Sequence, residues 1–144
     1  MLMMRMADAW VRGSNPWCGW MRLFLLPLML VPMWFGLMWA GMLLMTAWML
    51  LPMVFSKPSG RDHWMTRACL GVQIWRSRPL DDLCSLLLVT LAGGGLVLAS
   101  IMAMRQEPIL LACGVITYFG LYLGFLRRCG QRLDARTRSL VEAD

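Results

Sequence analysis

Charged residues and histidine are scarce in this sequence. Charged side chains make up only 15% of its 144 residues, and His63 is its one histidine. A soluble domain carries about 25% charged residues and about 45–50% apolar residues, whereas 59% of the residues here are hydrophobic. The charges are also missing from long continuous stretches, which a soluble core could not hide. The deficit excludes a soluble globular domain and predicts an all-α integral membrane protein.

The groups that most chemistry requires are missing as well. A haem or metal site within one chain needs two or more strong ligands, and His63 supplies only one. The long apolar runs hold no ionisable side chain at mid-depth, whereas proton relays and coupled transporters depend on such groups. The five cysteines form no C-x-x-C pair, which favours free thiols (Cys18, Cys69, Cys84, Cys113 and Cys129). We therefore expect no enzymatic activity, no cofactor and no metal.

Methionine is abundant, and its thioether allows one exception to that expectation. Thioethers bind Cu(I), so the methionines at the N-terminus could form a copper-binding arm (Met1, Met3, Met4 and Met6). Against this, methionine is an ordinary flexible apolar side chain in lipid. The alternative start at Met6 would remove the cluster altogether.

The formal net charge of +6 does not indicate a nucleic-acid partner. The arginines lie in short stretches between apolar runs, with no basic face on a soluble module. Such flanking charge sets membrane orientation and attracts anionic lipid headgroups. The partner that the charge predicts is the lipid bilayer.

Two apolar runs near the C-terminus predict a transmembrane hairpin. Residues 83–104 and 108–126 carry no charge over 22 and 19 residues, enough for one span each. Only Arg105, Gln106 and Glu107 separate them, so the two helices must be antiparallel. Pro108 suits the first position of the second helix, because its missing N–H costs nothing there.

Residues 24–55 form a longer uncharged run, which is too long for one upright span and short for two. Two spans place 13 of the 14 basic residues on one side of the membrane, whereas one span divides them ten to four. The positive-inside bias favours two spans. We expect a turn in residues 35–41, where Gly36 and Gly41 permit tight geometry, and a kink at Pro27 and Pro32. A re-entrant hairpin gives the same charge distribution and stays open.

Between the hairpins, residues 63–75 have the pattern of a short amphipathic helix. Trp64, Ala68, Gly71, Val72 and Trp75 share one face, with Thr66 and Arg76 on the opposite side. Tryptophan on one face and arginine on the other suit the headgroup boundary. We expect an interfacial helix on the cytoplasmic side.

These elements combine into four transmembrane helices in two hairpins, the first short and proline-kinked. We expect both termini to be cytoplasmic and the protein to lie in the cell (inner) membrane. The expected segments are an N-terminal stretch with a tryptophan motif, a short hairpin, a cytoplasmic loop with the interfacial helix, a second hairpin and a basic tail (residues 1–22, 23–55, 56–82, 83–126 and 127–144).

The most individual motif is NPWCGWMR at residues 15–22. In its simpler interpretation, Asn15 caps a helix that begins at Pro16, and the tryptophans anchor in headgroups. In the more specific interpretation, the motif packs on the helix of residues 63–75 and forms a polar pocket at the cytoplasmic interface. The residues of that candidate pocket are Asn15, Trp17, Trp20, Arg22, His63, Trp64, Arg67 and Trp75.

Small residues mark candidate helix contacts in the second hairpin. Gly120 and Gly124 form a G-x-x-x-G motif that Gly114 extends, and a run of small residues occupies positions 92–95. Small faces let helix backbones approach closely, either within the chain or between subunits. We expect a protein partner or a homo-oligomer through such packing.

Two motif stretches resemble an uncharacterised family of small predicted multi-pass membrane proteins from archaea and bacteria. The resemblance covers roughly residues 7–128. Its specific residues are Asn15, Pro16, Trp17, Trp20, Arg22, Leu26 and Pro27, then Trp64, Arg67, Ala68, Leu70, Gly71 and Trp75. Val72 stands where that pattern has an acidic residue. The resemblance implies the four-span layout and brings no activity, cofactor or partner with it.

Two functions fit these observations. The first is a non-enzymatic accessory or structural subunit of a membrane complex. The alternative is a small carrier that binds a lipid or another small molecule in a Trp/Arg pocket at the cytoplasmic interface. Retention of a stoichiometric protein or of a lipid after gentle extraction distinguishes the two.

Overall fold

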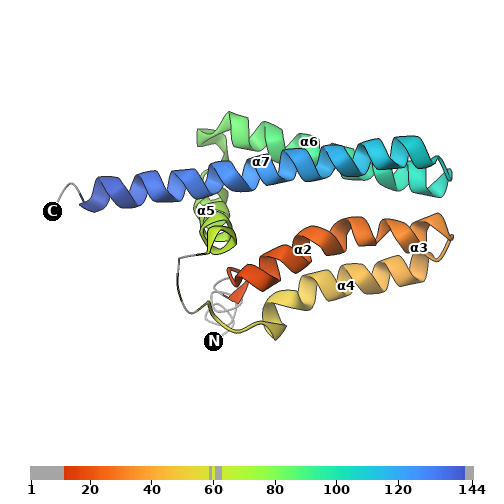
Figure 1. The fold of residues 1–144 in the computed structure, drawn as a ribbon, viewed down its shortest axis with the longest axis horizontal. Coiled ribbons are helices and arrows are strands. Elements are labelled where there is room, and N and C mark those ends of the chain that lie inside the picture. Colours follow the sequence, from red (N-terminus) through yellow and green to blue (C-terminus); the bar gives the residue numbers. More distant parts are fainter. Residues whose placement is uncertain (1–11, 59, 61–62, 142–144) are drawn as a thin grey trace.

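The chain folds into two layers of helices with one helix crossing between them (Figure 1). The computed structural model describes residues 12–58, 60 and 63–141, and this part of the chain contains no strand. Its elements are α2 (Pro16–Leu28), α3 (Leu30–Trp34), α4 (Met38–Val54), α5 (Trp64–Ser77), the 3-10 turn η1 (Pro79–Asp81), α6 (Leu83–Met104) and α7 (Pro108–Val141). The expected all-helical class is confirmed.

Helices α2, α3 and α4 form the first hairpin. Asn15 caps α2 by accepting a hydrogen bond from the Trp17 amide, and Pro16 takes the first helical position. The helix breaks between α2 and α3 at Met29, because Pro32 has no N–H to donate one turn back. The turn to α4 uses Gly36 at φ 72°.

Helices α6 and α7 form the second hairpin, joined by the short turn that the sequence predicts. Their contact is built on small side chains: Ala92, Gly95, Ala99 and Ala103 of α6 are all buried. A Cβ added at Gly114 would lie 2.9 Å from the Ala99 Cβ and from the Gly95 carbonyl oxygen. Close backbone packing therefore holds this hairpin together.

The turns of the two hairpins lie beside each other at one end of the molecule (Figure 1). The Gln106 side-chain amide donates to the Trp34 carbonyl oxygen at 3.5 Å, which links one turn to the other. Leu30 of α3 packs with Ala99 and Ala103 of α6 in a buried cluster just behind them. The first hairpin thus extends as far as the second one does.

Helix α5 crosses α7 and lies between the two layers. At the crossing, a Cβ added at Gly71 would lie 2.2 Å from the Cys129 carbonyl oxygen. Ala68 and Met65 are buried against Phe125 and Cys129 of α7. The face that carries Ala68 and Gly71 was expected to meet lipid headgroups, but it packs on protein.

Asp82 connects the start of α6 to the far part of α7. Its side chain accepts hydrogen bonds from the Ser85 amide and hydroxyl, and it forms ion pairs with Arg128 at 3.2 Å and Arg132 at 3.0 Å. Burial alone would raise the pKa of Asp82, yet hydrogen bonds from Arg128 and Ser85 and the charge of Arg132 lower it to about 2. We call this group the Asp82 clasp.

Three helices of the described part are long and apolar enough to cross a membrane: Pro16–Trp34, Leu83–Met104 and Pro108–Arg138. Met38–Val54 is apolar but shorter, with 17 residues. These helices indicate a membrane protein by length and composition.

Several expectations need correction. The tail expected to be only partly ordered from residue 127 is helical, because α7 continues through Val141 and packs on α5. Thr66 was expected on a polar face, but it is fully buried. Gly41 lies inside α4 and not in the turn. The methionine arm at residues 1–6 lies outside the described residues.

The crossing of α5 and α7 depends on glycine at position 71. We expect Gly71→Ala to lower the free energy of unfolding by roughly 1–3 kcal/mol, because the methyl group would overlap a backbone carbonyl that cannot rotate away. Thermal unfolding in detergent measures this. Gly93→Ala is the matched control, since a Cβ there meets no atom within 4 Å. Equal melting temperatures for the two variants would contradict the close crossing.

The Asp82 clasp predicts acid sensitivity. A carboxylate whose folded pKa is about 2 stabilises the fold fully above its unfolded pKa of about 3.9, and this stability is lost as pH falls from that value towards 2. Asp82→Asn should remove the stabilisation, about 1–3 kcal/mol, and flatten the dependence of the melting temperature on pH between about 4 and 2. Asp81→Asn, at the exposed neighbouring residue outside the clasp, is the control.

Candidate functional site

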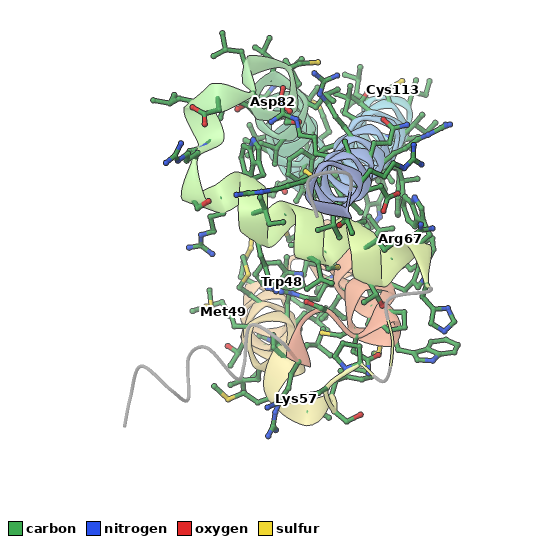
Figure 2. All side chains as sticks on the ribbon, turned by 90° about the vertical axis from the view of Figure 1, so that its left-hand side faces the viewer. Trp48, Met49, Lys57, Arg67, Asp82 and Cys113 are labelled. Atoms are coloured by element: carbon green, nitrogen blue, oxygen red, sulfur yellow. The ribbon has the colours of Figure 1, made fainter. Side chains whose placement is uncertain are left out.

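The most distinctive cavity lies where α2, α4, α5 and α7 meet. It has a volume of about 290 Å³. Figure 2 shows Trp48 on the α4 side of α5, with Asp82 on the opposite side of that helix. The polar and aromatic groups that line the cavity are Arg22, Trp48, Cys69, Gln73, Arg76 and Tyr122. We call it the Arg22 pocket.

Arg22 is held in place by Trp48. Its guanidinium carbon lies 4.2 Å from the centre of the Trp48 ring, a cation–π arrangement. In return, the indole Nε1 of Trp48 donates to the Arg22 carbonyl oxygen at 3.1 Å. The Nε of Arg22 is buried and has no hydrogen-bond partner in the described chain. The side chain is therefore oriented, but its hydrogen-bonding capacity is not used up.

Both charged side chains that line the Arg22 pocket, among the described residues, are cationic. Arg22 and Arg76 both line it, and no carboxylate does so among the described residues. Gln73 also faces it and donates to the hydroxyl of the fully buried Ser14 at 2.9 Å. A concave, mostly apolar site with a few convergent polar groups is the usual form of a small-molecule site.

Cys69 is the one thiol that lines the Arg22 pocket, and it is not activated. Burial is the largest influence on it and raises its pKa to about 11, although Arg22 acts in the opposite direction. The neutral thiol at pH 7 is a poor nucleophile and a poor metal ligand. Within the described residues, no group of three or more His, Cys, Asp or Glu side chains could hold a metal ion.

The structure brings part of the predicted pocket together. The rings of Trp20 and Trp64 lie 6.1 Å apart, so the tryptophan motif and α5 do meet. Of the eight residues predicted for the pocket, Arg22 alone lines the cavity. Asn15 caps α2 and donates to the Ser56 carbonyl oxygen at 3.2 Å, while Trp17 is 71% exposed.

The remaining predicted residues lie on other surfaces of α5. Arg67 forms an ion pair with Asp134 of α7 at 3.5 Å. Trp75 packs edge-on against Phe125, with ring centres 5.1 Å apart. His63 is the exposed residue that precedes α5 and makes no capping bond with its side chain. These residues attach α5 to α7 or face outward, so they do not contribute to the Arg22 pocket.

Comparison with known proteins identifies the family. Residues 3–116 match the family of unknown function DUF6653. The chain belongs to DUF6653. The resemblance to an uncharacterised family is thereby confirmed, and the matched range contains Arg22, Trp48, Gln73 and Arg76. No curated protein and no solved structure matches the chain.

In this DUF6653 member, the predicted glycine contacts divide into two groups. Gly114 meets α6 in the close contact described above, whereas a Cβ added at Gly120 or Gly124 would meet no atom within 4 Å. At 3.6 residues per turn, these two glycines lie about 240° and 280° around α7 from Gly114. They therefore face away from α6, and the prediction of a contact within the chain is wrong for both.

Sequence reasoning missed Trp48, Gln73, Arg76 and Tyr122. Trp48 lies deep in an apolar run, and nothing in the sequence alone pairs it with Arg22 across the hairpin. The sequence gives a clearer indication of the Asp82 clasp than of the Arg22 pocket. Asp82 and Ser85 have the spacing of a helix cap, and Arg128 and Arg132 stand one turn apart on one face of a helix.

Proposed function

We propose that this DUF6653 member is a non-enzymatic, multi-pass membrane protein that binds an anionic ligand in the Arg22 pocket. The observation that carries the proposal is the arginine side chain fixed over Trp48 with an unpartnered buried Nε. A buried donor without a partner costs about 1–3 kcal/mol. A phosphate or carboxylate oxygen in the pocket would satisfy that donor and neutralise the charge of Arg22.

The position of the Arg22 pocket along the helices supports a ligand at headgroup depth. Arg22 lies about 9 Å along α2 from Pro16, at 1.5 Å per residue. Helix α5 crosses the bundle at this level and forms one wall of the pocket. Charged side chains in membrane proteins are tolerated near the interface and mark binding sites when they face the bundle interior.

The same proposal includes four spans with α5 as an interfacial helix on the cytoplasmic side. Helix α4 has 17 residues and is about 26 Å long, slightly short of the roughly 30 Å of hydrocarbon, and thinning of the bilayer can cover the difference. The bond between Gln106 and the Trp34 carbonyl supports full crossing of the first hairpin over the re-entrant alternative.

Basic residues give the orientation within this proposal. Two full hairpins place 13 of the 14 basic residues on one side and Arg105 on the other, so we place both termini in the cytoplasm and the protein in the cell (inner) membrane. Helix α7, with 34 residues, is about 51 Å long and extends beyond the bilayer on that side. Its extension carries Arg128 and Arg132 of the Asp82 clasp.

A second candidate function, an accessory subunit, is favoured by one observation. Gly120 and Gly124 leave an open strip on a membrane-crossing helix, which another helix could approach closely. This strip would serve a protein partner or a second copy of the chain. Replacement of both glycines by leucine should then abolish a co-purifying subunit and leave the fold intact, because a Cβ at either position meets no atom within 4 Å.

Topology can be tested by cysteine labelling. In a cysteine-free background, we expect Leu37→Cys and Glu107→Cys to react with an impermeant thiol reagent from outside intact cells. Gly60→Cys should react only after the membrane is opened. A protected Leu37→Cys beside an accessible Glu107→Cys would instead support the re-entrant hairpin and contradict four spans.

The Arg22 pocket predicts charge-selective binding. Arg22→Gln keeps a polar side chain but removes the cation, so affinity for dihexanoyl phosphatidylglycerol should fall roughly tenfold or more, since a charge-assisted bond contributes about 1.5–3 kcal/mol. Titration monitored by native mass spectrometry measures this, with dihexanoyl phosphatidylcholine as the zwitterionic comparison. Arg138→Gln, in the exposed far part of α7, is the matched control. Equal binding by both variants would refute an anion site at Arg22.

A further inference from the structure

A second cavity lies nearer the hairpin turns than the Arg22 pocket does. It is an almost wholly apolar groove of about 510 Å³ with Leu96 of α6 on one side. Five methionines line the rest, together with a few small or aliphatic residues; they come from the break between α2 and α3, from α3 and from α4. We call it the methionine groove (Met29, Met33, Met38, Met42 and Met45).

The pocket and the groove lie along one seam. On the arm of the first hairpin that α2 and α3 form, Arg22 is followed by Leu26, Met29 and Met33 at steps of three or four residues. The last three line the groove. On α4, Met45 precedes Trp48 by three residues in the same way. Residues at such spacing share one helix face, and α2 and α4 are in contact. The seam is therefore positive at the α5 end and apolar along the rest.

We propose that one anionic phospholipid occupies both cavities, with its headgroup phosphate at Arg22 and one acyl chain in the methionine groove. The inference rests on the proposed function and names its ligand. Charge complementarity selects the occupant, because Arg22 faces one end of the seam with a buried, unpartnered Nε, while no charged side chain of the described residues lines the other end. Methionine side chains are flexible and polarisable, which suits an acyl chain that changes shape.

The methionine groove differs from an ordinary lipid-facing surface in its position. Helix α4 packs on α2 and α3, while α6 packs on α3 and α7, so the groove lies between the two hairpins. From Arg22 to Met33 the seam is about 16 Å long, at 1.5 Å per residue. This length accommodates much of one acyl chain across half of a bilayer of about 30 Å.

Gly41 allows the groove to be closed without disturbing the fold. It lines the groove, and a Cβ added there meets only the Met33 Cγ, at 3.9 Å. Gly41→Leu should lower retention of oleoyl lysophosphatidylglycerol roughly fivefold or more, because the new side chain takes the place of the acyl chain and its dispersion contacts. Binding of dihexanoyl phosphatidylglycerol, whose short chains do not enter the groove, should stay unchanged.

Two further variants complete the experiment. Gly93→Leu adds the same side chain to α6 where a Cβ meets nothing within 4 Å, away from the groove, and should bind both probes as the wild type does. Ser100→Leu fills the groove from the α6 side and should repeat the Gly41→Leu result. It also replaces Gly41→Leu if that variant fails to fold, as judged by size-exclusion chromatography and melting temperature.

The outcomes separate the two proposals. If both groove variants keep the long-chain lipid while Arg22→Gln loses it, the acyl-chain site is overturned and the anion site stands. If Arg22→Gln binds the short-chain anionic probe as the wild type does, the proposed function fails and the inference fails with it. If the groove variants lose oleoyl lysophosphatidylcholine as strongly as its anionic counterpart and the wild type prefers neither, the groove is an unselective lipid surface, and the inference is overturned.

Discussion

The close approach of the Gly71 backbone to the Cys129 carbonyl is the contact on which the rest of the arrangement depends. A side chain at this position would lift α5 away from α7, because a backbone carbonyl cannot yield as a side chain can. Helix α5 is also the element that bridges the two hairpins beside the Arg22 pocket. One missing side chain thus decides whether α5 can form a wall of the Arg22 pocket.

The basic residues on one side of the protein perform different tasks. Arg128 and Arg132 are held by the Asp82 clasp, and Arg67 pairs with Asp134, so these three fix α7 to its neighbours. Arg22 faces a cavity that no carboxylate of the described residues lines, and we propose that its charge serves a ligand there. A count of positive charge predicts an orientation in the membrane, but only the tertiary structure shows which arginines are paired with carboxylates.

Local sequence predicted the elements well and their contacts poorly. The helix of residues 83–104 has the bounds that its uncharged run predicts, and Gly36 forms the expected turn. In the turn between α6 and α7, Gln106 has φ 56°, which is a left-handed conformation. A glycine in the sequence would have indicated this conformation, whereas a glutamine does not. Of the eight residues predicted for the pocket, Arg22 alone lines it, because the other groups there come from α4, α5 and α7.

The sequence by itself determined the helical class, the apolar runs long enough to cross a bilayer and the cap at Asn15, because these depend on neighbours within a few residues along the chain. The tertiary structure alone decided that Arg22 lies over Trp48 and that Asp82 binds two arginines of α7. It also decided that Gly114 contacts α6 while Gly120 and Gly124 do not. These contacts join residues far apart in the sequence, and they follow from the crossing of α5 and the rotation of α7, which local patterns do not encode.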